Sequence, residues 1–313
     1  MFNRKNSLDS NNTSFSRYCN QNLFDIMFCE WEYSANNKHI ILKTINGGNL
    51  KTARTNSKVE QKTFYFIIET VYLKGEIYVL GTDYAFSNNI IIVKKYRADS
   101  KLWEHVFDFD NRRDFCVSAL INSIYIIGGF YSNALDSCLL YNTKSSNVKG
   151  AGRMNTARYR AACAVFEGKI VVSGGYVQAR NYDFGRVFNF TNSVEAYDHT
   201  TDTWSNMPNM VEGTYDHSLV AIKDKLYVIG FSCEIYDSLS KKFVLINKPS
   251  LGSSLYIGQK NRAVSIANKI FVFRRNESKV TSYNVDTREW TEEDCDVTDS
   301  IKTECCVKIP QYD

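Results

Sequence analysis

The stretch from Ala157 to Trp204 decides the fold, and it reads ARYRAACAVFEGKIVVSGGYVQARNYDFGRVFNFTNSVEAYDHTTDTW. It contains short runs of apolar, β-branched and aromatic residues. The pairs Glu167-Gly168 and Gly174-Gly175 separate the first runs, and a third run turns near Asp198. Short runs bounded by Gly and Asx residues are typical of antiparallel strands joined by hairpins. The stretch therefore predicts one four-stranded meander, whose fourth strand starts near Trp204.

The same unit recurs along most of the chain. The core of its second strand reads GEIYVLGT (75–82), NSIYIIGG (122–129), GKIVVSGG (168–175), DKLYVIGF (224–231) and NKIFVFRR (268–275). In its outer half a Tyr precedes a large apolar residue by seven positions, as in Tyr96 and Trp103, Tyr141 and Val148, Tyr197 and Trp204, Tyr236 and Phe243, and Tyr283 and Trp290. Five matches in register indicate a repeat protein.

This pattern resembles the Kelch repeat, in which each copy forms one blade of a β-propeller. The resemblance covers about residues 24 to 310, with repeats of roughly 40 to 55 residues. It implies that glycines after the second strand permit positive φ, and that outer Tyr and Trp residues fill the wedge between blades. The residues that carry it, and for which it implies structural roles, are Gly128, Gly129, Gly174, Gly175, Tyr197, Trp103, Trp204 and Trp290.

The expected architecture is an all-β Kelch propeller of six four-stranded blades, one of them composite. Residues 1–22 are rich in Asn and Ser and are predicted to be a disordered polar leader, and residues 23–313 a single domain. The segment from Leu23 reads as the two outer strands of a blade, and Lys302–Pro310 can supply an inner strand that closes the ring. A five-bladed ring is the alternative, because this C-terminal segment is short. Residues 45–62 are polar and are expected to form a surface loop.

Composition argues against several classes of protein. The net charge of +4 is too small to indicate nucleic-acid or membrane binding, and no basic run of five residues occurs. No window is long and apolar enough for a transmembrane helix, and no apolar signal-peptide core is visible. The nine cysteines are scattered, odd in number and without a CxxC motif. Free thiols in a reducing compartment fit this pattern, so a cytoplasmic location is expected.

The sequence offers little support for an enzyme. Propellers of similar blade design include copper oxidases, but a metal site requires clustered His, Cys or carboxylate residues. The chain has four histidines, and of these His217 alone begins an inner strand that could line the channel. Neither a nucleophile elbow nor an HExxH motif is present. We therefore expect no catalytic residue, metal, cofactor or small-molecule substrate.

Two arginines at the head of inner strands are candidates for partner binding. Substrate-receptor Kelch propellers often carry an Arg at this position that binds acidic peptide groups. Here the position, thirteen residues before the centre of the second strand, is held by Arg112 and Arg158, whereas the other blades have Tyr65, Thr214 and Gly258. The alternative is that Arg112 and Arg158 only tie the blades together through carboxylates or backbone carbonyls.

An insert, residues 176–192, lengthens one loop between a second and a third strand. It is expected on the same face as the arginines, and aromatic and Arg residues of the kind it holds are favoured at interaction hot spots. It could instead be a hairpin that extends the sheet. The candidate binding residues are Arg180, Tyr182, Phe184, Arg186 and Phe188.

The resemblance implies a role in protein binding. Kelch propellers of this type usually follow BTB and BACK domains, and there they act as substrate adaptors of cullin-based ubiquitin ligases or bind actin. This chain starts almost at the first blade, so the BTB and BACK domains are expected to be lacking. The prediction is a non-enzymatic interaction module that recognises substrates for ubiquitin ligation. The alternatives are an actin-binding Kelch protein and a stand-alone scaffold.

Overall fold

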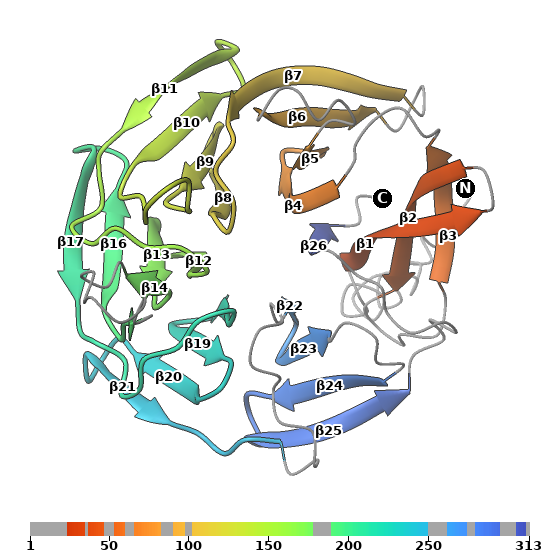
Figure 1. Cartoon of the computed structure of the whole chain (residues 1–313). Helices are drawn as coiled ribbons and strands as arrows, with labels where there is room; N and C mark the ends of the chain where they lie inside the picture. The colour runs from red at the N-terminus through yellow and green to blue at the C-terminus, as the bar shows by residue number, and fades with distance from the viewer. Residues whose placement is uncertain are drawn as a thin grey trace, which may run out of the picture.

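The computed structural model describes residues 24–34, 37–46, 53–59, 66–82, 90–97, 102–177, 189–249, 262–273, 279–294 and 305–310. These residues form six four-stranded antiparallel sheets and one two-stranded ribbon. Figure 1 shows the sheets arranged around a central axis, each with one strand innermost. The all-β propeller expected from the sequence is confirmed. The predicted leader, residues 1–22, lies outside the described residues.

Five of the sheets are continuous repeats, and we number them as blades in chain order. Blade 1 is β4 (Phe66–Leu73), β5 (Glu76–Thr82), β6 (Ile90–Arg97) and β7 (Leu102–Asp110). Blade 2 is β8 (Cys116–Leu120), β9 (Ser123–Ile127), β10 (Cys138–Asn142) and β11 (Asn147–Ala151). Blade 3 is β12 (Ala162–Phe166), β13 (Lys169–Ser173), β16 (Val194–Asp198) and β17 (Thr203–Met207), and its insert carries the ribbon β14 (Tyr176–Val177) and β15 (Asn189–Phe190).

The last two continuous repeats complete this series. Blade 4 is β18 (Ser218–Ile222), β19 (Lys225–Ile229), β20 (Cys233–Asp237) and β21 (Lys242–Leu245). Blade 5 is β22 (Arg262–Ile266), β23 (Lys269–Phe273), β24 (Lys279–Asn284) and β25 (Glu289–Asp294).

A sixth sheet joins the two ends of the chain. This composite blade has the order β26 (Cys305–Pro310), β1 (Phe24–Ser34), β2 (Asn37–Asn46) and β3 (Ala53–Val59). Its inner strand β26 contacts β22 on one side and β4 on the other, and the inner strands of neighbouring blades contact each other in the same way. The contacts of the inner strands therefore close into a ring (Figure 1).

Two expectations about the composite blade were wrong. The N-terminal segment supplies the second, third and fourth strands of the sheet, not only the outer two. The fourth strand is β3, which lies within the polar residues 45–62 that were expected to be a loop. An outermost strand can be polar, because one of its edges has no neighbour; β11, the outermost strand of blade 2, has the sequence NVKGA and is largely exposed. Tyr33 also precedes an apolar residue, Ile40, by seven positions, but it pairs with Lys38, so the spacing in this segment does not mark a strand register.

In the five continuous blades the seven-residue spacing reflects the register between the third and fourth strands. The Tyr of the third strand lies directly opposite the apolar residue seven positions later, as in Tyr197 and Trp204. The ring centroids of that pair lie 5.2 Å apart, and those of Tyr283 and Trp290 lie 4.9 Å apart. Aromatic pairs across antiparallel strands stabilise a sheet. The repeat detected in the sequence is therefore the spacing of one hairpin.

The core is divided into layers between blades. One apolar cluster joins blades 1 and 2, a second joins blades 2 and 3, a third joins blades 3 and 4, and a fourth joins blades 4 and 5. Tyr197 and Trp204 belong to the second cluster, together with Ile170 and Cys138. Blades 2, 3 and 4 therefore bury both of their sheet faces against their neighbours, which explains why their second strands are almost continuously apolar.

Candidate functional site: the loop face of the propeller

The loops between second and third strands share one face with the linkers between blades, and we call it the loop face. Gly128 and Gly129 begin the loop of blade 2, and Gly174 and Gly175 begin that of blade 3, all four with positive φ. A Cβ at Gly128 would lie 2.6 Å from the carbonyl oxygen of Arg158, so a side chain there would collide with the linker. Glycine thus lets the loop and the linker lie against each other.

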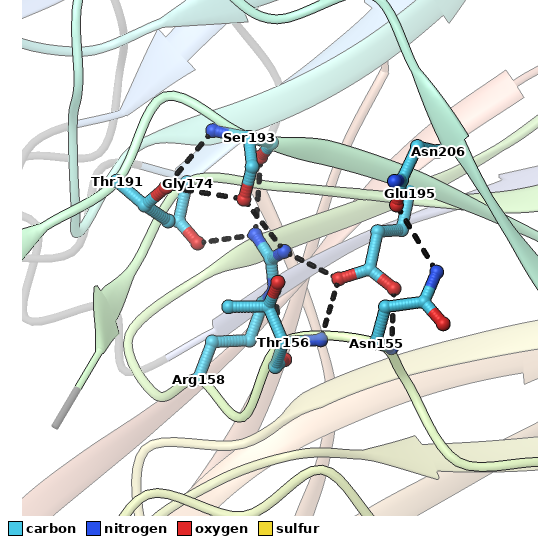
Figure 2. A network of polar contacts seen from close by, with 8 residues as sticks. All are labelled: Asn155, Thr156, Arg158, Gly174, Thr191, Ser193, Glu195 and Asn206. Carbon is cyan, nitrogen blue, oxygen red and sulfur yellow. Dashed lines mark hydrogen bonds and ion pairs between the residues drawn. The ribbon is translucent and has the colours of Figure 1, made fainter.

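Figure 2 shows the network of polar contacts that surrounds Arg158. Its side chain is 1 % exposed. It donates hydrogen bonds to the carbonyl oxygens of Gly174 and Ser193, at 2.8 and 3.1 Å, and pairs with the Glu195 carboxylate at 2.7 Å. Glu195 also accepts hydrogen bonds from the backbone N–H groups of Asn155 and Thr156. The ion pair therefore fastens the linker before blade 3 to the interior of that blade.

Arg112 occupies the equivalent place in blade 2. Its side chain is 3 % exposed, and it makes a bidentate contact with Asp110, with both distances 2.6 Å. It also donates to the carbonyl oxygens of Gly128 and Ser137. Both guanidinium groups are therefore buried and bonded to the chain itself, which favours the alternative that Arg112 and Arg158 hold the fold together. Partner binding by either residue stays a hypothesis.

The most distinctive surface of the described loop face is a row of aromatic rings. We call it the aromatic strip; from blade 2 to the linker before blade 4 it comprises Phe130, Tyr159, Tyr176, Tyr215 and Phe190. Neighbouring ring centroids along the strip lie between 4.4 and 5.6 Å apart. At one end of the strip the Phe190 side chain is 51 % exposed. At the other end Tyr131, which follows Phe130 in the chain, is 63 % exposed.

Backbone bridges hold this strip in place. Tyr159 and Tyr176 exchange two backbone hydrogen bonds, at 3.1 and 2.8 Å, and Arg113 and Phe130 exchange two at 2.9 and 2.8 Å. Burial raises the pKa of the Tyr176 hydroxyl, and its hydrogen bond with Tyr215 raises that pKa further. Backbone hydrogen bonds therefore tie the loops that carry the strip to the linkers beside them. No feature of the repeat predicted the strip, since its members come from two loops and two linkers.

A charged collar lies beside the strip, two residues before the inner strands of blades 2, 3 and 4. It consists of Asp114, Arg160 and Asp216, all with positive φ. The Arg160 guanidinium lies 3.6 Å from the Asp114 carboxylate and 3.2 Å from that of Asp216. The backbone N–H of Arg160 donates to the Asp114 carbonyl, and that of Asp216 donates to the Arg160 carbonyl. The collar therefore links three successive blades around the axis.

The inner strands enclose a small cavity of about 110 Å³. Its polar lining includes Glu69, Arg262, His217, Cys116 and Cys163. Arg262 pairs with Glu69 at 2.9 Å, and His217 Nε2 lies 2.8 Å from the Ser173 hydroxyl. Within the described ranges, no three His, Cys, Asp or Glu side chains are grouped so as to hold a metal ion. A cavity of this size has room for several water molecules.

Several predicted positions lie outside the described residues. The candidate insert residues Arg180, Tyr182, Phe184, Arg186 and Phe188 fall in the gap between β14 and β15. Their role in binding stays a prediction. On either side of this gap, Tyr176 and Phe190 are described, and both belong to the aromatic strip. The two described parts of the insert therefore meet at the strip.

Comparison with known proteins agrees with this geometry. A family model described as "Kelch motif" matches residues 157–211. Kelch-like protein 36 of Rattus norvegicus is 27% identical over 179 residues, which cover 55% of this chain and 28% of the relative. Kelch-like protein 23 of Homo sapiens is 26% identical over 190 residues, or 58% of this chain and 32% of the relative. Kelch repeat protein C2 of Camelpox virus is 26% identical over 171 residues, or 51% of this chain and 30% of the relative.

These matches confirm the resemblance to the Kelch repeat that the sequence predicts. The matched segment, residues 157–211, includes blade 3, Arg158 and Glu195. The chain matches only about a third of the length of these relatives, or less.

Among the described residues, no helix has the length and apolar character needed to span a membrane.

Proposed function

We propose that this chain, a propeller similar to Kelch-like proteins, is a non-enzymatic module that binds partner proteins through its loop face. The aromatic strip carries this proposal. Tyr and other aromatic side chains supply much of the binding free energy at protein interfaces. Because backbone bridges already order the strip, binding would cost little conformational entropy. Because the side chains of Arg112 and Arg158 are buried, the proposal rests on aromatic side chains rather than on these two charges.

The biological role we propose is substrate recognition for a cullin-based ubiquitin ligase in the cytoplasm. The similarity to Kelch-like proteins 36 and 23 supports this choice. The bound species would be a protein substrate, with no nucleic acid, membrane or small molecule involved. Binding to actin, or service as a stand-alone scaffold, remains the second candidate, because Kelch propellers also serve those roles.

The test uses exposed residues, so that folding is preserved. Phe190 and Tyr131 on the loop face would be changed to Ala in one variant, and the control would be Leu239→Ala in an outer turn, where the side chain is 88 % exposed. Proteins captured from cytoplasmic lysate would be identified by mass spectrometry, and the affinity of each would be measured by calorimetry. We expect the loop-face variant to lose at least tenfold in affinity, or roughly 1.4 kcal/mol, while the control keeps the parent affinity.

The identity of the captured protein separates the two roles. A substrate that is ubiquitinated in a reconstituted reaction supports ligase recognition, whereas actin supports the cytoskeletal role. Equal affinities for the parent, the variant and the control would show that the loop face is not the binding surface. The affinity should also change little between low and high salt, since exposed charges are screened by salt and the aromatic contacts are not.

A further inference from the structure

Blade 4 contains a buried carboxylate with no cationic partner among the described residues. Glu234 is 0 % exposed. It accepts hydrogen bonds from the backbone N–H groups of Val211 and Glu212, at 2.7 and 2.9 Å, and one from the Ser232 hydroxyl at 3.3 Å. The Glu195 carboxylate in blade 3 also accepts hydrogen bonds from two successive backbone N–H groups, but it pairs with Arg158 as well. A buried charge is costly unless it is paired.

Thr214 stands where blades 2 and 3 have Arg112 and Arg158. The Arg158 carbonyl accepts a hydrogen bond from the N–H of Gly129, and the Thr214 carbonyl accepts one from the N–H of Gly175 in the same manner. The Thr214 side chain is 1 % exposed, and its Oγ1 has no hydrogen-bond partner. A Cβ built on Gly230 would lie 3.2 Å from this Oγ1, so the hydroxyl points toward the loop of blade 4. An unsatisfied buried hydroxyl often marks a bound water or ion.

The carbonyl frame that holds the guanidinium in blade 3 is retained in blade 4. In blade 3 the N–H of Gly174 donates to the Ser193 carbonyl at 3.1 Å, and Arg158 bonds to both carbonyl oxygens. In blade 4 the N–H of Gly230 donates to the Ser232 carbonyl at the same distance, 3.1 Å. Blade 4 therefore has the two equivalent carbonyl oxygens, those of Gly230 and Ser232, but no guanidinium bonded to them.

We propose that blade 4 binds a monovalent cation, Na⁺ or K⁺, where the guanidinium of Arg158 lies in blade 3. Its ligands are the Glu234 carboxylate, the Thr214 hydroxyl and the carbonyl oxygens of Gly230 and Ser232. Hard cations take oxygen ligands of these kinds. A single carboxylate among neutral oxygens matches a single positive charge, which Arg112 supplies in blade 2 and Arg158 in blade 3. The ammonium of Lys248 lies instead over the Phe231 ring, 4.8 Å from its centroid.

The first experiment measures the thermal midpoint of the intact chain in KCl, in NaCl and in choline chloride at equal ionic strength. Choline is too large for a site of this kind and serves as the reference. We expect the midpoint to rise by about 2–4 °C in KCl or NaCl, the shift produced by a tenfold stabilisation of a domain of this size. Glu234→Gln removes the charge, and Thr214→Arg supplies a tethered guanidinium. Each substitution should abolish the difference between salts, and Glu289→Gln, at an exposed position, should retain it.

The second experiment locates the ion directly and does not depend on any variant folding. Crystals grown in RbCl should give an anomalous scattering peak between Glu234 and Thr214. Equal midpoints in the three salts, together with a peak-free map in which a water occupies this place, would overturn the proposal. The same holds if Glu289→Gln loses the salt difference as fully as Glu234→Gln. The cation site is independent of partner binding, so neither result bears on the proposed function.

Discussion

Arg158 and Glu195 show how single residues hold this propeller together. Both side chains are 1 % exposed, so the pair has lost its hydration. Burial lowers the pKa of Arg158, and the Glu195 carboxylate opposes that change. A buried ion pair contributes little net stability when intact, but removal of one member leaves an unpaired charge in the interior. Replacement of one member of the pair should therefore reduce the stability of the protein more than replacement of both.

Arg158→Ala should destabilise the protein strongly. We expect the free energy of unfolding, measured by urea denaturation, to fall by about 3–5 kcal/mol because Glu195 is left buried and unpaired. The double variant Arg158→Ala with Glu195→Gln should recover part of this loss. Arg153→Ala is the control, since Arg153 pairs with Asp136 but its side chain is 71 % exposed. A loss of under 1 kcal/mol for Arg158→Ala would contradict the prediction.

At the scale of elements, the outer turn of one blade is bonded to the linker that leaves the previous blade. Asp202 accepts hydrogen bonds from the N–H of Gly152 at 2.7 Å and from the hydroxyl of Tyr197 at 2.6 Å. The indole N–H of Trp204 donates to the Gly152 carbonyl at 2.8 Å. A Cβ on Gly152 would lie 2.2 Å from the Asp202 carbonyl oxygen, so only glycine allows this approach. Trp290 repeats the contact with the carbonyl of Asn247, at 2.6 Å.

The Asp202 contact predicts a dependence of stability on pH. The hydrogen bond from Tyr197, and after it the bond from Gly152, lowers the pKa of Asp202 in the folded protein. A carboxyl whose folded pKa is depressed stabilises the fold above its unfolded pKa, near 3.9, and loses that contribution as pH falls through the folded pKa. The parent should therefore exceed Asp202→Asn in unfolding free energy by about 0.5–1 kcal/mol at pH 7, and the difference should shrink as pH falls below about 4.

Urea titrations of both proteins between pH 7 and pH 3 measure this difference. The control is Asp224→Asn, at an exposed position in a turn. Its curve should run parallel to that of the parent over the same range. A difference between the parent and Asp202→Asn that grows as the solution becomes acidic would have the wrong sign and would refute the assignment.

At the scale of the whole molecule, closure of the ring depends on a pairing between the two ends of the chain. β26 pairs with β1 from Phe24 opposite Pro310 to Cys29 opposite Cys305. The same strand contacts β4 and β22, so it completes the circle of inner strands. This contact joins residues separated by nearly the full length of the chain, and its loop-closure entropy opposes early formation.

Removal of β26 should open the ring. A chain that ends at Thr303 exposes the edge of β1, and an unpaired edge favours association with other chains. We expect its thermal midpoint to fall by roughly 5 °C or more, and light scattering to detect larger particles. A chain that ends at Pro310 keeps β26 and serves as the control. A truncated chain that remains monomeric with the parent midpoint would show that β26 is dispensable.

The repeat could be predicted from the sequence because its signals are local. Tyr197 and Trp204 face each other in one hairpin, so a fixed spacing encodes their contact. The turn at Glu167 and Gly168, where both residues have positive φ, is equally local. The roles of Arg112 and Arg158 could not be decided, because their partners are set by how loops from separate strands meet. The strand β3 was missed because an outermost strand requires no apolar alternation.

By itself the amino-acid sequence determined the all-β class, the blade as repeating unit and the positions of the aromatic pairs, since each depends on residues within a few positions of one another. Tertiary structure alone decided which face the aromatic strip covers, that Glu195 neutralises Arg158, and that Glu234 and Thr214 are both buried. These features join residues from different elements, and the distance between such residues depends on the curvature of the ring rather than on their separation along the chain.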